Sequence, residues 1–136
     1  MRLEFTEDQE AFRQELREWL AENLPDGWTD GNRSILQDQE ERVSFLREWQ
    51  KKLHEGGWAG IHWPEEYGGR GASLVEQLIY DQETARVNAP DILNSLGIDL
   101  VGPTLMEVGT EYQKERFLPK ILNAEEIWCQ GYSEPN

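Results

Sequence analysis

Hydrophobic residues near the N-terminus recur at intervals of three and four, the spacing that places side chains on one face of an α-helix. The residues of this stripe are Phe12, Leu16, Trp19 and Leu20. Thr6 and Gln9 precede it at the spacing of a capping box, in which each side chain bonds the backbone N–H of the other. Pro25 follows the stripe and cannot continue a helix. The pattern predicts a first helix that begins after Thr6 and ends before Pro25.

A second stripe of the same spacing follows a turn-rich connection over residues 25–37. Its members are Val43, Leu46, Trp49 and Leu53. Gly56 and Gly57 come next and are a typical stop signal for a helix. Each of the two predicted helices has one apolar stripe and one charged face, so we expect both to lie at the surface of a helical core.

The segment 57–71, GWAGIHWPEEYGGRG, contains too many Gly and Pro residues for a regular element. Ser73 and Glu76 then form a second capping box, ahead of an apolar run at helical spacing. This predicts a third helix that ends near Pro90.

Residues 91–109, DILNSLGIDLVGPTLMEVG, have apolar side chains on nearly every side of a helical projection. Such a pattern is typical of a helix buried in the middle of a domain. Gly97, Gly102 and Pro103 interrupt the run. They predict close approach of a neighbouring element and a kink or break within the helix.

A third capping box, Thr110 with Gln113, opens a helix that we expect to run through Phe117. Pro119 is well suited to the first turn of a helix and poorly suited to its interior. We therefore expect a shorter helix to restart at Pro119 and to fade around Asn123.

The last ten residues, IWCQGYSEPN, change character. Ile127, Trp128, Cys129 and Tyr132 favour an extended strand, and Ser133-Glu134-Pro135 is typical of a turn. A strand needs a partner for its backbone groups, and the rest of the chain offers no second strand. The fold class predicted is all-α, with a helical-bundle domain over residues 1–126. Residues 127–136 are expected to be the first strand and turn of a β-domain that the chain does not contain.

Composition narrows the possible partners. The 27 acidic and 13 basic residues give a net charge of −14, which argues against nucleic-acid binding and against adsorption to anionic lipid. Cys129 is the only cysteine, so no internal disulfide can form and a reducing compartment is indicated. Neither a signal peptide nor a membrane-spanning run is present. We therefore expect a cytoplasmic protein without membrane insertion.

The residues alone reveal no convincing catalytic group. GGRG at 68–71 lacks the spacing of both the dinucleotide-binding loop and the P-loop, so a structural turn is favoured. Two histidines, His54 and His62, with one distant cysteine make a metal site improbable. The paired glutamates, such as Glu125–Glu126, are most simply solvated.

Four stretches taken together resemble the N-terminal region of the acyl-CoA dehydrogenase family. They are FTEDQEAFRQELREWL, WPEEYGGRGAS, GTEYQKERFLPKIL and WCQGYSEP, and they span the chain in the order found in the family. The resemblance implies a helical N-terminal domain, followed in the family by a small β-domain and a C-terminal four-helix bundle that hold FAD between them. It also implies that the region around Leu96 to Leu105 is similar to the family's acyl-pocket wall, although plain core packing explains these residues equally well.

The same resemblance implies cofactor-binding roles for four residues of the segment 127–136, which we call the tail. These four residues match the strand motif that lines the flavin ring in the family. These residues are Gln130, Gly131, Tyr132 and Ser133. The Ser133 hydroxyl and the backbone at Tyr132 are expected to bond the pyrimidine side of the isoalloxazine. Tyr132 replaces an aliphatic residue common in the family, and the alternative interpretation of Ser133 is a turn residue.

The function implied is FAD-dependent α,β-dehydrogenation of acyl-CoA thioesters, with an electron-transferring flavoprotein as redox partner and a homo- or hetero-oligomeric assembly. The family's glutamate base belongs to the C-terminal bundle, so no residue here is expected to be catalytic, and this chain alone is expected to be inactive. The alternative is a non-catalytic helical subunit or interaction module that pairs with a flavin-bearing partner.

Overall fold

The computed structural model describes residues 4–135, and within them the fold is built from α-helices with no β-strand. The helices are α1 (Glu7–Asn23), α2 (Gln39–Glu55), α3 (Leu74–Arg86), α4 (Gly102–Val108) and α5 (Glu111–Leu122). Two short 3-10 turns, Ser34–Leu36 and Glu65–Tyr67, and one π-helical turn, Gly97–Val101, lie between them. The all-α fold expected from the sequence is confirmed. No helix in this part of the chain is both long and apolar enough to cross a membrane.

The three capping boxes form as predicted. The hydroxyls of Thr6, Ser73 and Thr110 accept hydrogen bonds from the backbone N–H groups of Gln9, Glu76 and Gln113 at 3.3, 3.2 and 3.2 Å. In each box the third helical side chain bonds back to the capping residue. The starts of α1, α3 and α5 are therefore fixed by local sequence.

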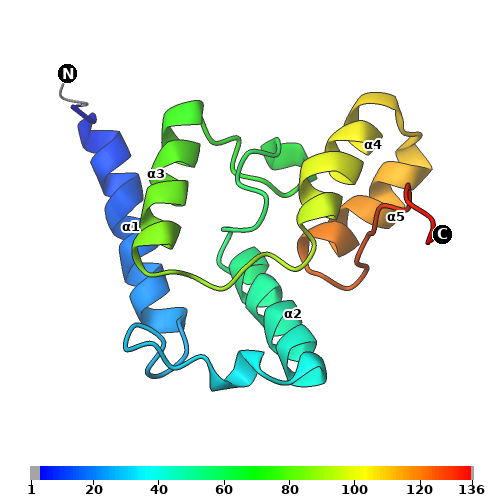
Figure 1. Cartoon of the computed structure of the whole chain (residues 1–136). Coiled ribbons are helices and arrows are strands. Elements are labelled where there is room, and N and C mark those ends of the chain that lie inside the picture. The colour runs from blue at the N-terminus through cyan, green and yellow to red at the C-terminus, as the bar shows by residue number, and fades with distance from the viewer. Residues whose placement is uncertain (1–3, 136) are drawn as a thin grey trace.

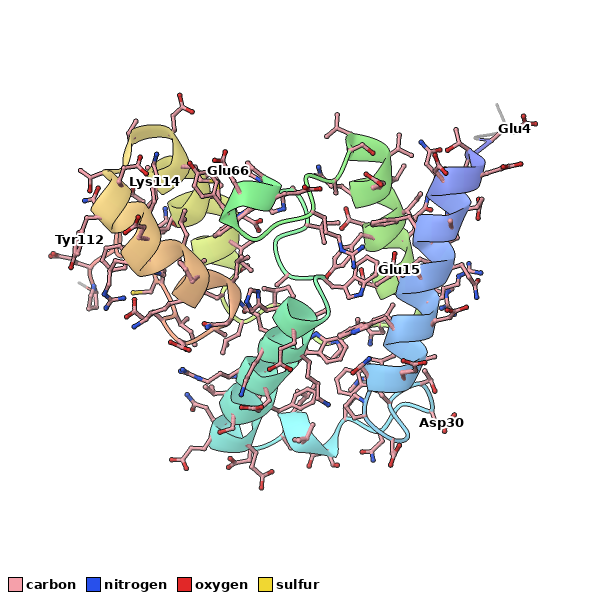
Figure 2. All side chains as sticks on the ribbon, turned by 180° about the vertical axis from the view of Figure 1, so that it is seen from behind. Glu4, Glu15, Asp30, Glu66, Tyr112 and Lys114 are labelled. Carbon is pink, nitrogen blue, oxygen red and sulfur yellow. The ribbon has the colours of Figure 1, made fainter. Side chains whose placement is uncertain are left out.

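Two pairs of helices flank a central region. Figure 1 shows α1 and α3 side by side on one flank and α4 with α5 on the other, with α2 and the segment 57–73 between them. The core residues are Phe12, Leu16, Leu20, Trp49, Leu53, Trp58, Ala59, Ile61, Trp63, Ile79, Ile98, Leu118, Ile121 and Leu122. The charged ends of labelled side chains such as Glu4 and Asp30 point outward in Figure 2.

The glycine-rich segment 57–71 is irregular, as expected, but it contributes much of the core. It folds back on itself because the Gly71 N–H donates to the Trp63 carbonyl at 2.8 Å and the Ala72 N–H donates to the Ile61 carbonyl at 2.9 Å. Arg70 lies 3.6 Å from the ring centroid of Trp58 and bonds a nearby backbone carbonyl. The Arg70 guanidinium of the GGRG stretch is thus engaged by groups of its own loop and by Glu15 of α1, at 3.2 Å.

The expectation of a helix buried on nearly every side over residues 91–109 is wrong, because Leu100 and Val108 are 50% and 76% exposed. Helical backbone runs from Ser95 to Val108 without a break, and its irregularity is the π-turn at Gly97–Val101 that leads directly into α4. Pro103 follows this turn and has no N–H to donate to the carbonyl of Ile98 five residues earlier. The Trp63 indole N–H supplies that donor at 2.8 Å.

The expected restart at Pro119 is also wrong, because α5 runs continuously from Glu111 to Leu122 with the proline inside it. An interior proline costs a helix about 3 kcal/mol. Leu118, Ile121 and Leu122 flank it and are almost fully buried, and each buried aliphatic side chain contributes about 1.5–3 kcal/mol. Packing on both sides of Pro119 therefore outweighs its local cost.

Candidate functional site

A pocket of about 440 Å³ lies between α3 and the segment that leads into α4. Its lining residues are Trp58, Gly60, Ile61, His62, Gln77, Tyr80, Asp81, Ile92, Ser95, Ile98 and Asp99. The buried core residues Trp58, Ile61 and Ile98 supply apolar walls. The other groups bring hydroxyl, carboxylate, amide and imidazole side chains to the same space. Such a mixture suits an organic ligand that carries a few polar substituents.

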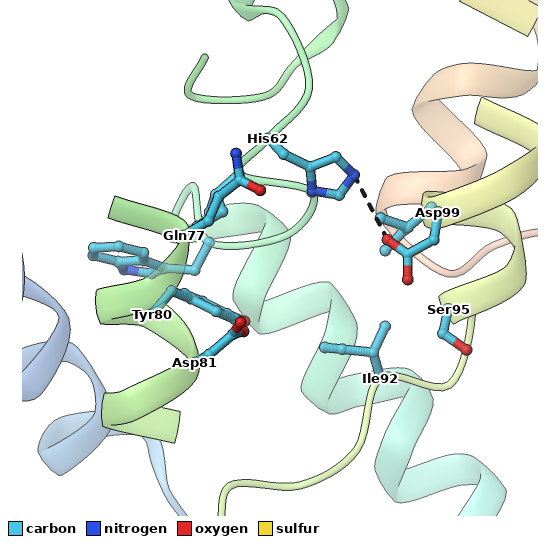
Figure 3. A pocket seen from close by; sticks show the side chains of 11 residues that line it. His62, Gln77, Tyr80, Asp81, Ile92, Ser95 and Asp99 are labelled. Atoms are coloured by element: carbon cyan, nitrogen blue, oxygen red, sulfur yellow. Dashed lines mark ion pairs between the residues drawn. The ribbon is translucent and has the colours of Figure 1, made fainter. Parts of the chain in front are cut away.

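Polar groups approach the pocket from opposite sides. In Figure 3, Gln77, Tyr80 and Asp81 project from α3, and His62 lies opposite Asp99 across the opening. The Nε2 atom of His62 is 3.6 Å from Oδ1 of Asp99, and the two side chains are 33% and 62% exposed. Ile98 and Asp99 are consecutive residues of the π-turn. Ile98 is buried and faces the core, so the next residue, Asp99, lies on the outer side of the turn at the rim of the pocket.

Tyr80 presents a hydroxyl that stays protonated. Burial, and after it the charge of Asp81, raises the pKa of Tyr80 to about 12. The phenol is therefore a neutral hydrogen-bond donor throughout the physiological range. A second hollow of about 350 Å³ shares Tyr80, Asp81 and Ile92 with the first, so the space extends past Tyr80 along α3.

The tail residues 130–133 lie away from this pocket, and none of them lines it. All four are exposed, and within the described part of the chain neither their backbone nor their side chains make a hydrogen bond. A Cβ atom added at Gly131 would meet no atom within 4 Å. The segment thus presents unused donors and acceptors, with room for a flat ligand to approach.

Comparison with known proteins identifies the domain. Residues 6–125 match the family described as "Acyl-CoA dehydrogenase, N-terminal domain". The chain belongs to the acyl-CoA dehydrogenase family. The acyl-CoA dehydrogenase IpdE1 of Mycolicibacterium smegmatis is 44% identical over 133 residues, which cover 93% of this chain and 33% of that protein. FadE26 of Mycobacterium tuberculosis is 37% identical and covers 99% of this chain and 33% of its own length.

Two solved structures resemble this acyl-CoA dehydrogenase domain. The first is the ChsE4-ChsE5 complex of Mycobacterium tuberculosis, with a TM-score of 0.77, 38% identity, and coverage of 99% of this chain and 32% of the other. The second is the Tcur3481-Tcur3483 steroid ACAD, with a TM-score of 0.75, 36% identity, and coverage of 99% and 34%. The first is described as a complex of ChsE4 and ChsE5, and the second carries the names of two proteins. The chain spans about a third of the length of the relatives that it matches.

The acyl-CoA dehydrogenase domain contributes Ile98 and Asp99 to the pocket from the region around Leu96 to Leu105, whose role in an acyl-pocket wall stays a prediction. Two further interpretations from the sequence concern the paired glutamates and a metal site. Glu126 is not simply solvated, because Arg116 bonds it at 2.7 Å and that bond lowers its pKa. Within residues 4–135, no three His, Cys, Asp or Glu side chains gather as a metal site.

The sequence interpretation missed three buried polar residues of the acyl-CoA dehydrogenase domain, Gln50, Glu83 and Asn94, which are 0%, 1% and 0% exposed. A signal for two of them was present. Glu83 lies four residues after the buried Ile79, and Gln50 lies three before the buried Leu53, so both fall on apolar faces. A polar residue on the apolar face of a helix indicates a buried network.

Proposed function

We propose that this chain is the N-terminal domain of an FAD-dependent acyl-CoA dehydrogenase that catalyses α,β-dehydrogenation of acyl-CoA thioesters. The observation that carries the proposal is the match to the family domain over residues 6–125. The pocket at the α3 side supports it, because part of its wall is the segment that resembles the family's acyl-pocket wall. The base that removes the α-proton belongs to the C-terminal bundle in the family. This domain's task is to bind and orient the acyl group.

The tail fits the flavin as far as its own groups can be tested. Gln130, Gly131, Tyr132 and Ser133 keep their donors and acceptors free within the described residues, and the space at Gly131 is open. The Ser133 hydroxyl and the Tyr132 backbone would hold the pyrimidine edge of the isoalloxazine. When bound, FAD supplies the acceptor for the β-hydrogen, which leaves as hydride. The Ser133 hydroxyl donates toward the edge that becomes negative on reduction.

The acyl group that we propose is a ring system with oxygen substituents rather than a plain alkyl chain. A related solved structure is titled a steroid ACAD. The pocket adds support, since Tyr80, Ser95 and Asp99 offer hydrogen bonds that a hydrocarbon cannot use. Burying such groups against a hydrocarbon would leave them unpaired at a cost of about 1–3 kcal/mol each. A hydroxyl group on the ligand would pair with any of the three, and a keto group would accept a hydrogen bond from Tyr80 or Ser95.

A heteromeric assembly is the arrangement that we favour, because one similar structure is a complex of ChsE4 and ChsE5 and the other carries two protein names, Tcur3481 and Tcur3483. In it, a partner subunit supplies surfaces that this domain lacks, and an electron-transferring flavoprotein receives the electrons. The second candidate function, a non-catalytic helical subunit beside a flavin-bearing partner, rests on the same two structures. Flavin content of the purified complex, assigned to each subunit, separates the two.

Turnover of matched substrates tests the function. The FAD-loaded enzyme that contains this domain should oxidise lithocholoyl-CoA with a higher kcat/KM than cholanoyl-CoA, which lacks the hydroxyl, and this chain alone should oxidise neither. Tyr80→Phe should shrink the preference about fivefold to tenfold, as expected for one hydrogen bond. An artificial electron acceptor provides the assay. Dehydrogenation by this chain alone, or no oxidation of any acyl-CoA by the loaded enzyme, would contradict the proposal.

Ser133→Ala tests the flavin contact in the same enzyme. The substitution removes one donor to a group that becomes charged on reduction, and such a bond contributes about 1.5–3 kcal/mol. For a two-electron couple this corresponds to a reduction potential about 30–60 mV lower. Flavin reduction by substrate should slow accordingly. Ser44→Ala, at an exposed position of α2, is the matched control, and equal potentials in the two variants would make Ser133 a turn residue only.

A further inference from the structure

Asn94 lies between the wall of the pocket and the segment that leads to Gln130–Ser133, and it contacts both. Its side chain is fully buried. We propose that Asn94 is a positioning residue, which holds the flavin-facing segment at a fixed place relative to the acyl pocket. The inference rests on the proposed function, because it takes residues 130–133 as the flavin-facing segment.

Three hydrogen bonds tie the Asn94 amide to the end of α5 and to the tail. Its Oδ1 accepts the backbone N–H of Trp128 at 2.9 Å. Its Nδ2 donates to the carbonyls of Glu126 at 2.9 Å and Ile121 at 3.0 Å. The orientation of the amide follows from its partners, since one is a donor and two are acceptors. A buried amide that lost these partners would be costly, so the geometry is held firmly.

The backbone of Asn94 belongs to the pocket wall. Its carbonyl accepts the N–H of Ile98 at 3.0 Å, and Ser95 follows it directly in the chain. Ile98 and Ser95 both line the pocket. Gly97 leaves space for the amide, because a Cβ atom there would lie 2.6 Å from Oδ1 of Asn94. A shift of this wall therefore moves the amide that holds the tail.

Trp128 is the last tail residue whose backbone or side chain is anchored to the described residues. Its N–H bonds Asn94, and its ring packs edge-on against Phe117 with centroids 5.5 Å apart. Gln130 follows two residues later, and two residues of extended chain span at most about 7 Å. The Asn94–Trp128 bond thus limits where residues 130–133 can lie before any flavin contact forms.

Arg47 provides a control, because it bonds carbonyls just after α5 and, among the described residues, no hydrogen bond joins it to Asn94 or Trp128. Its Nη1 donates to the carbonyls of Ala124 at 3.1 Å and Glu125 at 3.3 Å. Gln50 also bonds the end of α5, but its Oε1 accepts the backbone N–H of Asn94 at 3.0 Å, so it belongs to the same network as Asn94. If Asn94 only satisfied carbonyls at the end of α5, loss of Arg47 would have the same consequences as loss of Asn94.

Amide hydrogen exchange in the 136-residue chain tests, without flavin, whether Asn94 holds the tail. In the wild type, the Trp128 N–H should exchange at least tenfold more slowly than the amides of residues 129–133. In Asn94→Ala, Trp128 should lose at least tenfold more protection than the Leu118 amide of α5, which reports overall stability. In Arg47→Ala, the two amides should change by equal factors. Gly97→Ala, which keeps Asn94 but crowds its amide, should behave like Asn94→Ala.

The flavin spectrum tests the consequence. In the FAD-loaded enzyme that contains this domain, Asn94→Ala should shift the visible flavin absorption and lower kcat with little change in KM, and Arg47→Ala should change neither. An unprotected Trp128 amide in the wild type, equal behaviour of the Asn94 and Arg47 variants, or an unshifted flavin band in Asn94→Ala would overturn the inference. A wild-type enzyme that binds no FAD would instead overturn the proposed function, while the exchange rates would still decide whether Asn94 holds the tail.

Discussion

Replacing Glu83 with Gln should lower the free energy of unfolding of this domain by about 3 kcal/mol at neutral pH. Glu83 is 1% exposed and receives hydrogen bonds from Arg13, Arg17 and Arg86 at 2.6–3.0 Å. These bonds join α1 to α3, so the carboxylate links two helices as well as three charges. Removing one member of a buried ionic cluster leaves the others uncompensated, at a cost of about 3–5 kcal/mol. The amide oxygen of Gln retains part of the hydrogen bonding, which places the expected loss at the lower end.

Acid should remove the same contribution from the wild type. Burial on its own raises the pKa of Glu83, but the hydrogen bonds from Arg17, Arg13 and Arg86 outweigh it and lower the pKa from 4.5 to about 2. A depressed pKa in the folded state means that this stabilisation is complete above about pH 4.5 and is lost as the pH falls toward 2. The shift corresponds to roughly 3 kcal/mol.

Urea denaturation followed by circular dichroism, repeated from pH 7 to pH 2, measures both effects. The stability of Glu83→Gln should depend less on pH below 4.5 than that of the wild type. Glu66→Gln makes the same chemical change at an exposed position and should leave stability within about 0.5 kcal/mol. Equal stabilities of Glu83→Gln and Glu66→Gln, or parallel acid profiles of Glu83→Gln and the wild type, would show that the cluster contributes nothing.

Local rules were sufficient where a short stretch of sequence determines the backbone. The three capping boxes and the stop signal at Gly56 fixed the ends of helices to within a few residues, because each depends on neighbours in the chain. The predicted connection over residues 25–37 agrees with the observed start of α2 at Gln39, but the cap of this helix was not predicted. Asp38 caps it by accepting the N–H groups of Glu40 and Glu41 at 2.9 and 3.0 Å, and the Glu41 side chain does not complete a capping box.

Tertiary contacts decided the places where local rules failed. Pro119 predicts a break in the helix, but α5 stays continuous because the neighbours of Pro119 are buried in the core. The apolar run at 91–109 argues for a buried helix, yet only one side of it meets the core. The donor that completes its π-turn comes from Trp63, 35 residues earlier. No periodicity within the run could reveal a partner at that distance.

The candidate site also contains residues that the sequence singled out and residues that only the fold brings together. The role of the region around Leu96 to Leu105 in an acyl-pocket wall stays a prediction, although Ile98 and Asp99 of that region do line the pocket. Tyr80 and His62 were not predicted, because they come from separate elements that only the fold brings together. The flavin-facing role of residues 130–133 stays a prediction, since those residues touch no other described part of the domain.

Gly102→Ala should destabilise the domain by about 2–3 kcal/mol, although alanine is the better helix former. Gly102 lies at the start of α4 against the ring of Trp63, whose Cη2 atom would be 2.7 Å from an added Cβ. Helix propensity favours alanine by about 1 kcal/mol. Overpacking costs about 1–3 kcal/mol, and the displaced indole would also lose its bond to the Ile98 carbonyl, about 0.5–1.5 kcal/mol more. The cost of overpacking and of the lost hydrogen bond therefore exceeds the gain in helix propensity.

The double variant with Trp63→Phe identifies the cause of that loss. Phenylalanine has one ring and lacks the outer benzo ring of the indole, whose Cη2 meets position 102, so Gly102→Ala should cost about 1–2 kcal/mol less in the Trp63→Phe background than in the wild type. Far-UV circular dichroism in urea gives all four stabilities without relying on tryptophan fluorescence. Gly131→Ala adds a methyl group where no atom lies within 4 Å and should be neutral. Additive losses in the cycle would mean that the indole does not require glycine at position 102, and that the π-turn is held by its own backbone alone.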